Sequence, residues 1–215
     1  MAVPAAAPAL ARFLPMRAPS QPSLFAELTG LPEGLVYEPD FITAGEEAVL
    51  LGHIDALAFV PFEFHGFVGK RAVAYFGWRF DFSAGRLDRA EAIPRFLLPL
   101  RDRAARFAGL KPAAFGHVLI NKYEPGAPIG WHRDRPQFAD VAGVSLGSSA
   151  RFRLRRRAGE GWERRTLMIE PRSIYLLRGP ARSEWEHSIP PAPKLRYSIT
   201  FRSLTDTARA RLEGP

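Results

Sequence analysis

The chain of 215 residues contains no cysteine, and this absence restricts the chemistry that it can carry. Disulfides, thiolate nucleophiles, zinc fingers and iron–sulfur clusters are excluded, so a metal ion would have to be held by histidine and carboxylate side chains. The chain also lacks an apolar run close to the roughly 18 residues that a membrane-spanning helix needs. We expect a cytoplasmic protein without a membrane partner, although the missing cysteines do not by themselves identify a compartment.

Lysine is scarce, whereas arginine is abundant. Of the 30 basic residues, 26 are arginine and 4 are lysine, and the 22 acidic residues leave a formal net charge of +8. A basic field attracts polyanions, and the planar guanidinium fork suits phosphate and carboxylate. A GC-rich genome would also enrich arginine without any function, so charge alone leaves nucleic-acid binding open.

Acidic residues are missing from the start of the chain, where none precedes Glu27. Residues 1–24 are rich in alanine and proline. This arginine-bearing start faintly resembles an organelle transit peptide, but its prolines oppose an amphipathic helix and a secretory apolar stretch is absent. We expect a disordered tail, followed by a chain long enough for one domain with a substantial core.

The first part of this domain mixes helices and strands. The sequence predicts a strand at 35–37, a helix after a capping box of Thr43 and Glu46, aromatic-rich strands or hairpins in 59–82, and a second helix through 93–107. Pro94 or Pro99 is expected in the first turn of the second helix. If the helix begins at Pro94, Pro99 would kink it.

After Gly109 the pattern is typical of an all-β fold. Short runs separated by Gly, Pro, Asp or Ser predict strands at 117–123, 131–134, 141–146, 150–155, 166–169, 173–177, 186–189 and 195–202. Strands of this number and spacing favour a jelly roll or barrel.

Two residues of one predicted strand suggest a metal site. His132 and Asp134 are two apart, so that their side chains share a face of the strand. His187 is the only later histidine. Two imidazoles and one carboxylate form the facial triad of non-haem Fe(II), with zinc hydrolase chemistry as the rival. A His-x-Asp pair alone is weak support, because such pairs on exposed strands are usually only solvated.

The last predicted strand alternates cleanly between apolar and polar residues. Its polar face carries Arg196, Ser198, Thr200 and Arg202. It is either an edge strand with its polar side in water, or a barrel strand whose two arginines clamp a dicarboxylate. Upstream, Asn121 and Tyr123 likewise share a face. With a metal triad, this combination favours 2-oxoglutarate, an anion that can chelate iron.

The assembly resembles the AlkB family of Fe(II)- and 2-oxoglutarate-dependent dioxygenases, from about Phe115 to Arg202. The resemblance is carried by Asn121-Lys122-Tyr123, Pro125-Gly126, Trp131-His132-Arg133-Asp134, Val144-Ser145-Leu146-Gly147, His187, and Arg196 followed by Arg202 with five residues between. It implies a mainly β protein with flanking helices (α+β), a double-stranded β-helix (jelly roll) core and an N-terminal substrate lid. The implied activity is oxidative dealkylation of N-alkylated nucleobases in DNA or RNA, releasing aldehyde, succinate and CO2.

The resemblance also implies a role for each matching residue. Iron would be bound by His132, Asp134 and His187. The carboxylates of 2-oxoglutarate would be bound by Arg196 at the distal end and Arg202 nearer the metal, assisted by Asn121 and Tyr123. Family members that repair DNA often carry a second acidic residue two positions after the metal-binding aspartate. Pro136 stands there instead, which leaves the base preference undefined.

The implied domain organisation has four parts. The tail of residues 1–24 precedes an N-terminal extension, 25–110, with helices and the lid; the catalytic double-stranded β-helix spans 111–204, and a C-terminal tail spans 205–215. In the lid, Phe67, Tyr75 and Trp78 are the candidates for substrate contact, and Tyr75 with Gly77 is similar to a family Tyr-Gly element.

A predicted basic hairpin follows the metal-binding segment. It contains Arg155, Arg156 and Arg157 beside a glycine turn. These arginines either contact phosphate or form the solvated side of a half-buried ribbon. The expected partner is alkylated DNA or RNA, single-stranded or with a flipped base, and we expect a monomer.

Two alternative functions remain open. The same oxygenase core could hydroxylate or demethylate a protein side chain or a small molecule, because the iron and 2-oxoglutarate machinery does not encode the main substrate. From another class, the chain could be a non-catalytic basic barrel that binds single-stranded nucleic acid.

Overall fold

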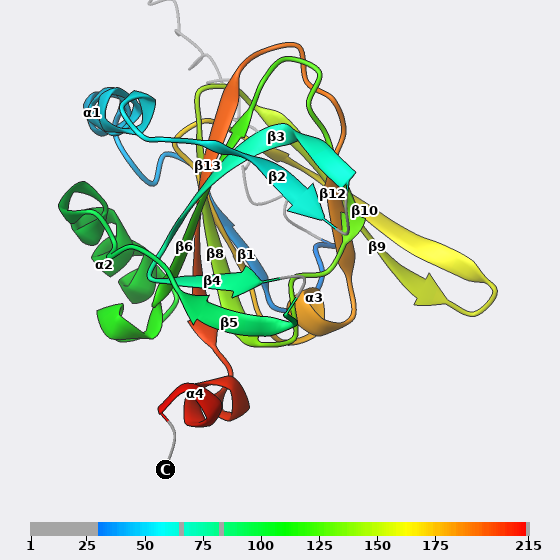
Figure 1. The fold of residues 1–215 in the computed structure, drawn as a ribbon. Helices are drawn as coiled ribbons and strands as arrows, with labels where there is room; N and C mark the ends of the chain where they lie inside the picture. Colours follow the sequence, from blue (N-terminus) through cyan, green and yellow to red (C-terminus); the bar gives the residue numbers. More distant parts are fainter. Residues whose placement is uncertain (1–29, 65–66, 82–83, 214–215) are drawn as a thin grey trace, which may run out of the picture.

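The computed structural model describes residues 30–64, 67–81 and 84–213, and the predicted tail at 1–24 lies outside this range. Figure 1 shows a core of β-strands with helices at its periphery. None of the helices in the described part of the chain has the length and apolar character needed to cross a bilayer.

The larger sheet is antiparallel and has the strand order β1-β11-β8-β13-β6-β3-β2. Its strands are β1 (Leu35–Glu38), β11 (Ile174–Leu177), β8 (Phe138–Leu146), β13 (Arg196–Leu204), β6 (His117–Tyr123), β3 (Phe67–Phe76) and β2 (Val60–Phe64). The smaller sheet has the order β10-β9-β12-β7, made of β10 (Gly161–Ile169), β9 (Ala150–Ala158), β12 (Glu186–Ile189) and β7 (Ile129–His132). A separate hairpin joins β4 (Trp78–Asp81) to β5 (Arg86–Arg89).

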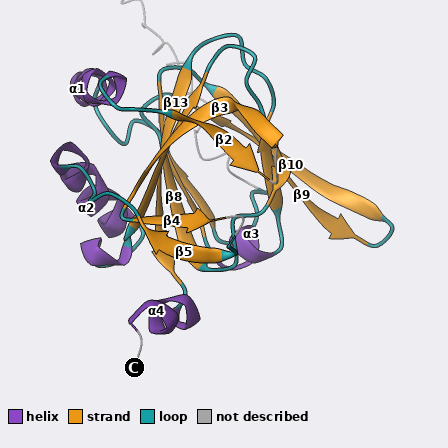
Figure 2. Cartoon of the chain, in the orientation of Figure 1, coloured by secondary structure: helices purple, strands orange, loops and turns teal. Residues whose placement is uncertain are grey.

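This arrangement is the double-stranded β-helix with flanking helices that the sequence predicted. The helical elements are α1 (Ala44–Asp55), η1 (Arg95–Leu97), α2 (Leu98–Phe107), η2 (Pro112–Ala114), α3 (Gly179–Ser183) and α4 (Asp206–Glu213). Figure 2 shows α1 and α2 on the same side of the molecule. Helix α4 lies within the predicted C-terminal tail, 205–215.

The helices α1 and α2 cover the outer face of the larger sheet. Ile54 of α1 and Leu100 and Ala104 of α2 are buried in one cluster with Ile199 and Phe201 of β13. The predicted capping box is confirmed, because Thr43 and Glu46 exchange hydrogen bonds at the start of α1. The second helix is not kinked: α2 begins only at Leu98, which places Pro99 in its first turn, where a missing N–H costs nothing.

Strand β13 lies in the middle of the larger sheet, between β8 and β6, and every residue from Arg196 to Ser203 is buried. The edge-strand alternative for 195–202 is therefore wrong. The apolar side chains of β13 pack under the helices, while its polar side chains face the interior between the sheets.

Two glycines allow close approach of neighbouring segments. Gly77, which joins β3 to β4, has a φ of +76°, and a Cβ there would lie 2.0 Å from the carbonyl oxygen of Gly116. A Cβ on Gly143 of β8 would lie 2.3 Å from the ring of Tyr175. This missing side chain leaves room for the Tyr175 ring, which borders the interior cavity.

Several predicted strand boundaries are wrong, including the start of the strand predicted at 141–146, because β8 already begins at Phe138. Strand β7 ends at His132, so Asp134 lies in the loop that follows and not on the strand predicted for 131–134. Strands β9 and β10 pair over nine residues each, beyond the predicted 150–155 and 166–169, because cross-strand pairing continues through the arginine-rich segment.

Candidate active site

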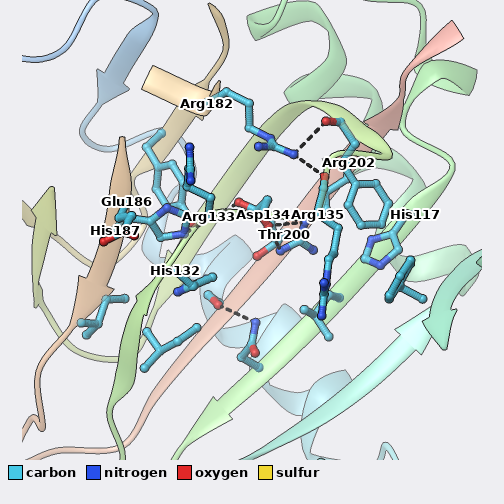
Figure 3. Close-up of a pocket in the computed structure, with 18 of the residues that line it drawn as sticks. His117, His132, Arg133, Asp134, Arg135, Arg182, Glu186, His187, Thr200 and Arg202 are labelled. Atoms are coloured by element: carbon cyan, nitrogen blue, oxygen red, sulfur yellow. Dashed lines mark hydrogen bonds and ion pairs between the residues drawn. The ribbon is translucent and has the colours of Figure 1, made fainter. Parts of the chain in front are cut away.

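A cavity of about 1110 Å³ lies between the two sheets. Its walls come from β6 and β13 of the larger sheet, β7 and β12 of the smaller sheet, the loop after β7, and α3. Figure 3 shows the polar side chains that these elements direct into it.

Two histidines lie side by side on neighbouring strands of the smaller sheet. His132 on β7 is the register partner of His187 on β12, and their ring centres are 4.3 Å apart. The Nδ1–H of His132 donates to the carbonyl oxygen of Gly130 at 2.8 Å. This bond leaves Nε2 of His132 as the nitrogen with a free lone pair.

Asp134 approaches the histidines from the loop after β7. Its Oδ1 accepts a hydrogen bond from Nε of Arg202 at 2.8 Å and forms an ion pair with Nη2 of the same residue, also at 2.8 Å. Its Oδ2 lies 3.7 Å from Nε2 of His187 and has no hydrogen-bond partner in the described part of the chain. One carboxylate oxygen is thus held by an arginine, and the other is directed at the histidines.

The protonation states of these groups suit a metal ion. Burial, followed by the neighbouring His132, lowers the pKa of His187 to about 3, and burial also lowers the pKa of His132. Burial alone would raise the pKa of Asp134, but the charge of Arg202 holds that pKa well below its usual range. Near neutral pH the cluster therefore presents two neutral imidazoles and a carboxylate, the forms that bind metals.

Two imidazole nitrogens and a carboxylate oxygen are donors that suit Fe(II), although the three side chains are not close enough to one another to coordinate one ion as they stand. Among the described residues, no three His, Asp or Glu side chains form a closed metal-binding group. The 3.7 Å between Oδ2 of Asp134 and Nε2 of His187 is near the roughly 3 Å between adjacent ligands that each lie about 2.1 Å from a first-row metal. The observation that favours a metal ion here is Oδ2 of Asp134, a buried carboxylate oxygen that has no hydrogen-bond partner in the described part of the chain.

Two arginines on β13 offer free donors to an anion. Nε of Arg196 donates to Oγ of Ser145 at 3.1 Å, and Nη1 of Arg196 has no partner among the described residues. Nη1 of Arg202 is likewise buried and without a partner there. Buried guanidinium donors are costly to leave unpaired, so a carboxylate-bearing ligand fits between them.

The predicted amide and phenol lie beside these arginines. Tyr123 and Asn121 on β6 are the register partners of Arg196 and Ser198 on β13. The guanidinium of Arg196 lies 5.2 Å from the ring centre of Tyr123, and Nδ2 of Asn121 donates to Ser198 at 3.3 Å. The structure thus brings together all seven residues that the sequence assigned to metal and 2-oxoglutarate.

Sequence analysis assigned no role to several arginines of the cavity, and two of them hold other residues of the site in place. Arg71 on β3 donates from Nε to Oδ1 of Asn121 at 3.1 Å. It shares strand parity with Tyr75, but only the register of β3 against β6 reveals which residues it faces. Arg182 of α3 donates to the carbonyl oxygens of Arg135 and, at 2.8 Å, of Phe138. It thereby anchors the loop that carries Asp134, and no periodic pattern marks it.

The predicted substrate contacts are only partly brought to the cavity. Tyr75 lines it, whereas Trp78 lies outside its lining and packs under the guanidinium of Arg89 at 4.8 Å. Phe67 begins β3, but its side chain lies outside the described part of the structure. His117 also lines the cavity and packs against Phe138, with ring centres 4.6 Å apart.

The three predicted hairpin arginines do not share one face. Arg155 pairs with Glu186 at 2.7 Å, and Arg157 is exposed on the same side of β9. Arg156 points to the opposite side, where it pairs with Glu163 at 2.7 Å and Glu184 at 2.9 Å.

Comparison with known proteins agrees with this geometry. Residues 83–202 match the model of the 2OG-Fe(II) oxygenase superfamily. The chain is 28% identical over 181 residues to a protein of Arabidopsis thaliana named alkylated DNA repair protein ALKBH8 homolog, covering 73% of this chain and 51% of the relative. It is 30% identical over 147 residues to the DNA oxidative demethylase ALKBH2 of Bos taurus, covering 62% of this chain and 51% of the relative. The chain thus spans about half the length of each of these relatives.

Among solved structures, that of OsALKBH1 superimposes with a TM-score of 0.65, covering 80% of this chain and 98% of the other. The identity is 16%, so this likeness shows a shared fold.

Proposed function

Because the chain belongs to the 2OG-Fe(II) oxygenase superfamily and is an AlkB-like Fe(II)/2-oxoglutarate dioxygenase, we propose that it oxidatively removes alkyl groups from N-alkylated nucleobases in DNA or RNA. The reaction would consume 2-oxoglutarate and O2, and its products would be the dealkylated base, the aldehyde, succinate and CO2. Support for this substrate class comes from relatives named as DNA repair and demethylase proteins and from the lining of the cavity.

The observation that carries the proposal is the excess of arginine in the cavity. Its lining contains six arginines and three carboxylates: Arg71, Arg133, Arg135, Arg182, Arg196 and Arg202 against Asp134, Asp140 and Glu186. Asp140 and Glu186 already pair with arginines outside the lining, Arg178 and Arg155. Two anionic groups of 2-oxoglutarate would occupy Arg196 and Arg202, and the positive charge of Arg71 and Arg133 would remain for a substrate that carries phosphate.

Aromatic side chains in the same cavity would hold a base. Phe62, Tyr75 and Phe80 line it together with these arginines. A base within a duplex cannot reach an interior site, so the target would be single-stranded or flipped out. Stacking contributes roughly 1–3 kcal/mol per base and is tolerant of base identity.

Each residue of the site would have a distinct task. His132, Asp134 and His187 would hold Fe(II), which together with 2-oxoglutarate supplies the oxidising chemistry when bound. Arg196 and Arg202 would bind and orient the two carboxylates of 2-oxoglutarate. Phe152, whose ring centre is 5.2 Å from that of His187, would limit the access of water to the ligands.

The test is aerobic turnover with Fe(II), 2-oxoglutarate and a panel of methylated oligonucleotides, single- and double-stranded, followed by mass spectrometry. We expect loss of one methyl group from at least one member, with stoichiometric succinate and formaldehyde, and no turnover by His187→Ala. If no member of the panel loses a methyl group while a peptide or small molecule supports succinate formation, base dealkylation is wrong and the oxygenase assignment stands.

A further inference from the structure

The β9–β10 hairpin projects from the molecule beyond the end of β12, as Figure 1 shows. One face of it continues the outer surface of the smaller sheet. In β9 this face carries Arg151, Arg153, Arg155 and Arg157, and in β10 their partners are Met168, Thr166, Arg164 and Trp162. Side chains directly opposite in an antiparallel pair lie on the same face, so this is one continuous surface.

Aromatic rings and guanidinium groups alternate on this surface. The guanidinium carbon of Arg155 lies 4.3 Å from the ring centre of Trp131 and 4.1 Å from that of Trp162. The guanidinium carbon of Arg157 also lies 4.3 Å from the ring centre of Trp162. We call Trp131, Arg155, Trp162 and Arg157 the Trp–Arg ladder. Stacking on a ring leaves the N–H edge of a guanidinium available to an oxyanion. In the ladder this applies to Arg157, whereas Nε of Arg155 donates to Glu186.

The ladder begins at the cavity and ends in solvent. Trp131 lies in the cavity lining, one residue before His132. Arg157 lies three residues beyond Leu154, the register partner of His187, which is about 10 Å along the strand. A linear polymer with one unit in the cavity could therefore follow this face outward.

Uncompensated charge is concentrated on this face. Glu186 offsets the charge of Arg155, but Arg157 and Arg164 are exposed and make no ion pair within the described part of the chain. On the opposite face Arg156 is neutralised by Glu163 and Glu184. The hairpin thus has one face suited to a polyanion and one that is internally paired.

We propose that the Trp–Arg ladder, with Arg164, binds the sugar–phosphate backbone of single-stranded nucleic acid that leads away from the nucleotide in the cavity. This inference rests on the proposed function for its choice of polymer. Alternation of aromatic and cationic groups along a path is the chemistry by which proteins bind single strands without reading their sequence.

The test compares two variants with the same change in net charge. Arg157→Gln/Arg164→Gln neutralises the ladder face, and Arg209→Gln/Arg211→Gln neutralises two exposed arginines of α4, which lies away from the hairpin. Binding of an unmodified single-stranded oligonucleotide of about 12 nucleotides is measured by fluorescence anisotropy across a salt series. We expect the slope of log K against log salt to fall by about 1.4 in the hairpin variant, from roughly 0.7 per phosphate contact, and to stay unchanged in the α4 variant.

Equal slopes for the two variants would overturn the proposal, because net charge alone would then account for binding. Equal loss of binding to polyglutamate of matched charge would also overturn it, in favour of an acidic protein partner. A second pair of variants tests the stacking of Trp162 against Arg155 and Arg157. Trp162→Ala should weaken oligonucleotide binding, and Trp162→Phe should retain most of it. The assay uses unmodified oligonucleotide, so an enzyme that fails to dealkylate bases still gives a result for the ladder.

Discussion

At the scale of single residues, the two cavity arginines of β13 differ in the charge of their hydrogen-bond partners. Arg202 donates a hydrogen bond from Nε to the Asp134 carboxylate and forms an ion pair with it, whereas Arg196 donates to the neutral hydroxyl of Ser145. The charge of Arg196 is therefore the less compensated of the two. Affinity for a dicarboxylate should depend strongly on this residue.

Arg196→Gln is expected to weaken 2-oxoglutarate binding by about ten- to a hundredfold. The reason is the loss of charge-assisted hydrogen bonds to a carboxylate, worth roughly 1.5–3 kcal/mol. Isothermal titration in the presence of Mn²⁺ measures the change, and circular dichroism checks that the buried substitution leaves the fold intact. The control is Arg86→Gln on β5, whose side chain is 73% exposed. Equal weakening in both variants would remove Arg196 from the binding site.

Some site residues could be predicted singly from the sequence, and others could not. Alternation along 195–202 placed Arg196 and Arg202 on one face, and this holds in the structure. The two-residue spacing also predicted that His132 and Asp134 face the same space, but for the wrong reason, since Asp134 lies beyond the strand. Its position is set by Arg202 and by the loop contacts of Arg182, which are long-range and leave no local signal.

At the scale of elements, the start of α1 is tied to α2 by one carboxylate. Glu46 accepts from the backbone N–H of Thr43 at 2.8 Å and from both terminal nitrogens of Arg103. The hydrogen bond from Arg103, followed by that from Thr43, lowers the pKa of Glu46 to about 2. This single side chain therefore satisfies a helix end and joins two helices that cover the larger sheet.

The contribution of Glu46 should depend on pH. Its pKa is lower in the folded state than in the unfolded state, so its stabilisation is present above the unfolded value of about 4.5 and is lost as pH falls towards about 2. Thermal melts are therefore expected to show Glu46→Gln less stable than the parent at pH 7, with the difference shrinking between pH 4.5 and 2. Glu160→Gln, an exposed site in the β9–β10 turn, provides the control. A constant difference across this range would contradict the ion-pair role.

Local sequence patterns predicted the bounds of strands well where most residues of the strand are buried. The predicted ranges 117–123 and 186–189 coincide with β6 and β12. The arginine-rich ends of β9 and β10 were missed, because their pairing is supported by stacked rings and ion pairs that have no apolar period. Element boundaries followed hydrophobic alternation only where burial was the main stabilising interaction.

At the scale of the whole molecule, the site exists only because distant strands pair in one register. His132 and His187 are 55 positions apart and meet through β7 and β12, whereas the arginines come from the other sheet. Parity along a strand predicts which residues share a face, but it does not define which strands are neighbours. In the sequence analysis, the resemblance to AlkB proteins indicated which residues from distant strands come together.

Ligands that join the two sheets should stabilise the entire fold. With Mn²⁺ replacing Fe²⁺ and 2-oxoglutarate at a hundred times its Kd, we expect about 2.7 kcal/mol of added stability, or roughly 5–11 °C in Tm. Differential scanning fluorimetry measures this shift, and a chelator should reverse it. Asp134→Ala should abolish the shift; a variant that retained it would place the metal elsewhere.

The hydrogen bond and ion pair between Asp134 and Arg202 connect one residue predicted to bind iron directly to one residue predicted to bind 2-oxoglutarate. A cation at Oδ2 would draw carboxylate charge away from Arg202, and an anion at Arg202 would release Asp134 towards the cation. The two binding equilibria are therefore coupled through this shared pair, and thermodynamic reciprocity requires that each partner raise the affinity for the other by the same factor. Replacing Arg202 would then change cooperativity between the two ligands as well as the affinity for either one.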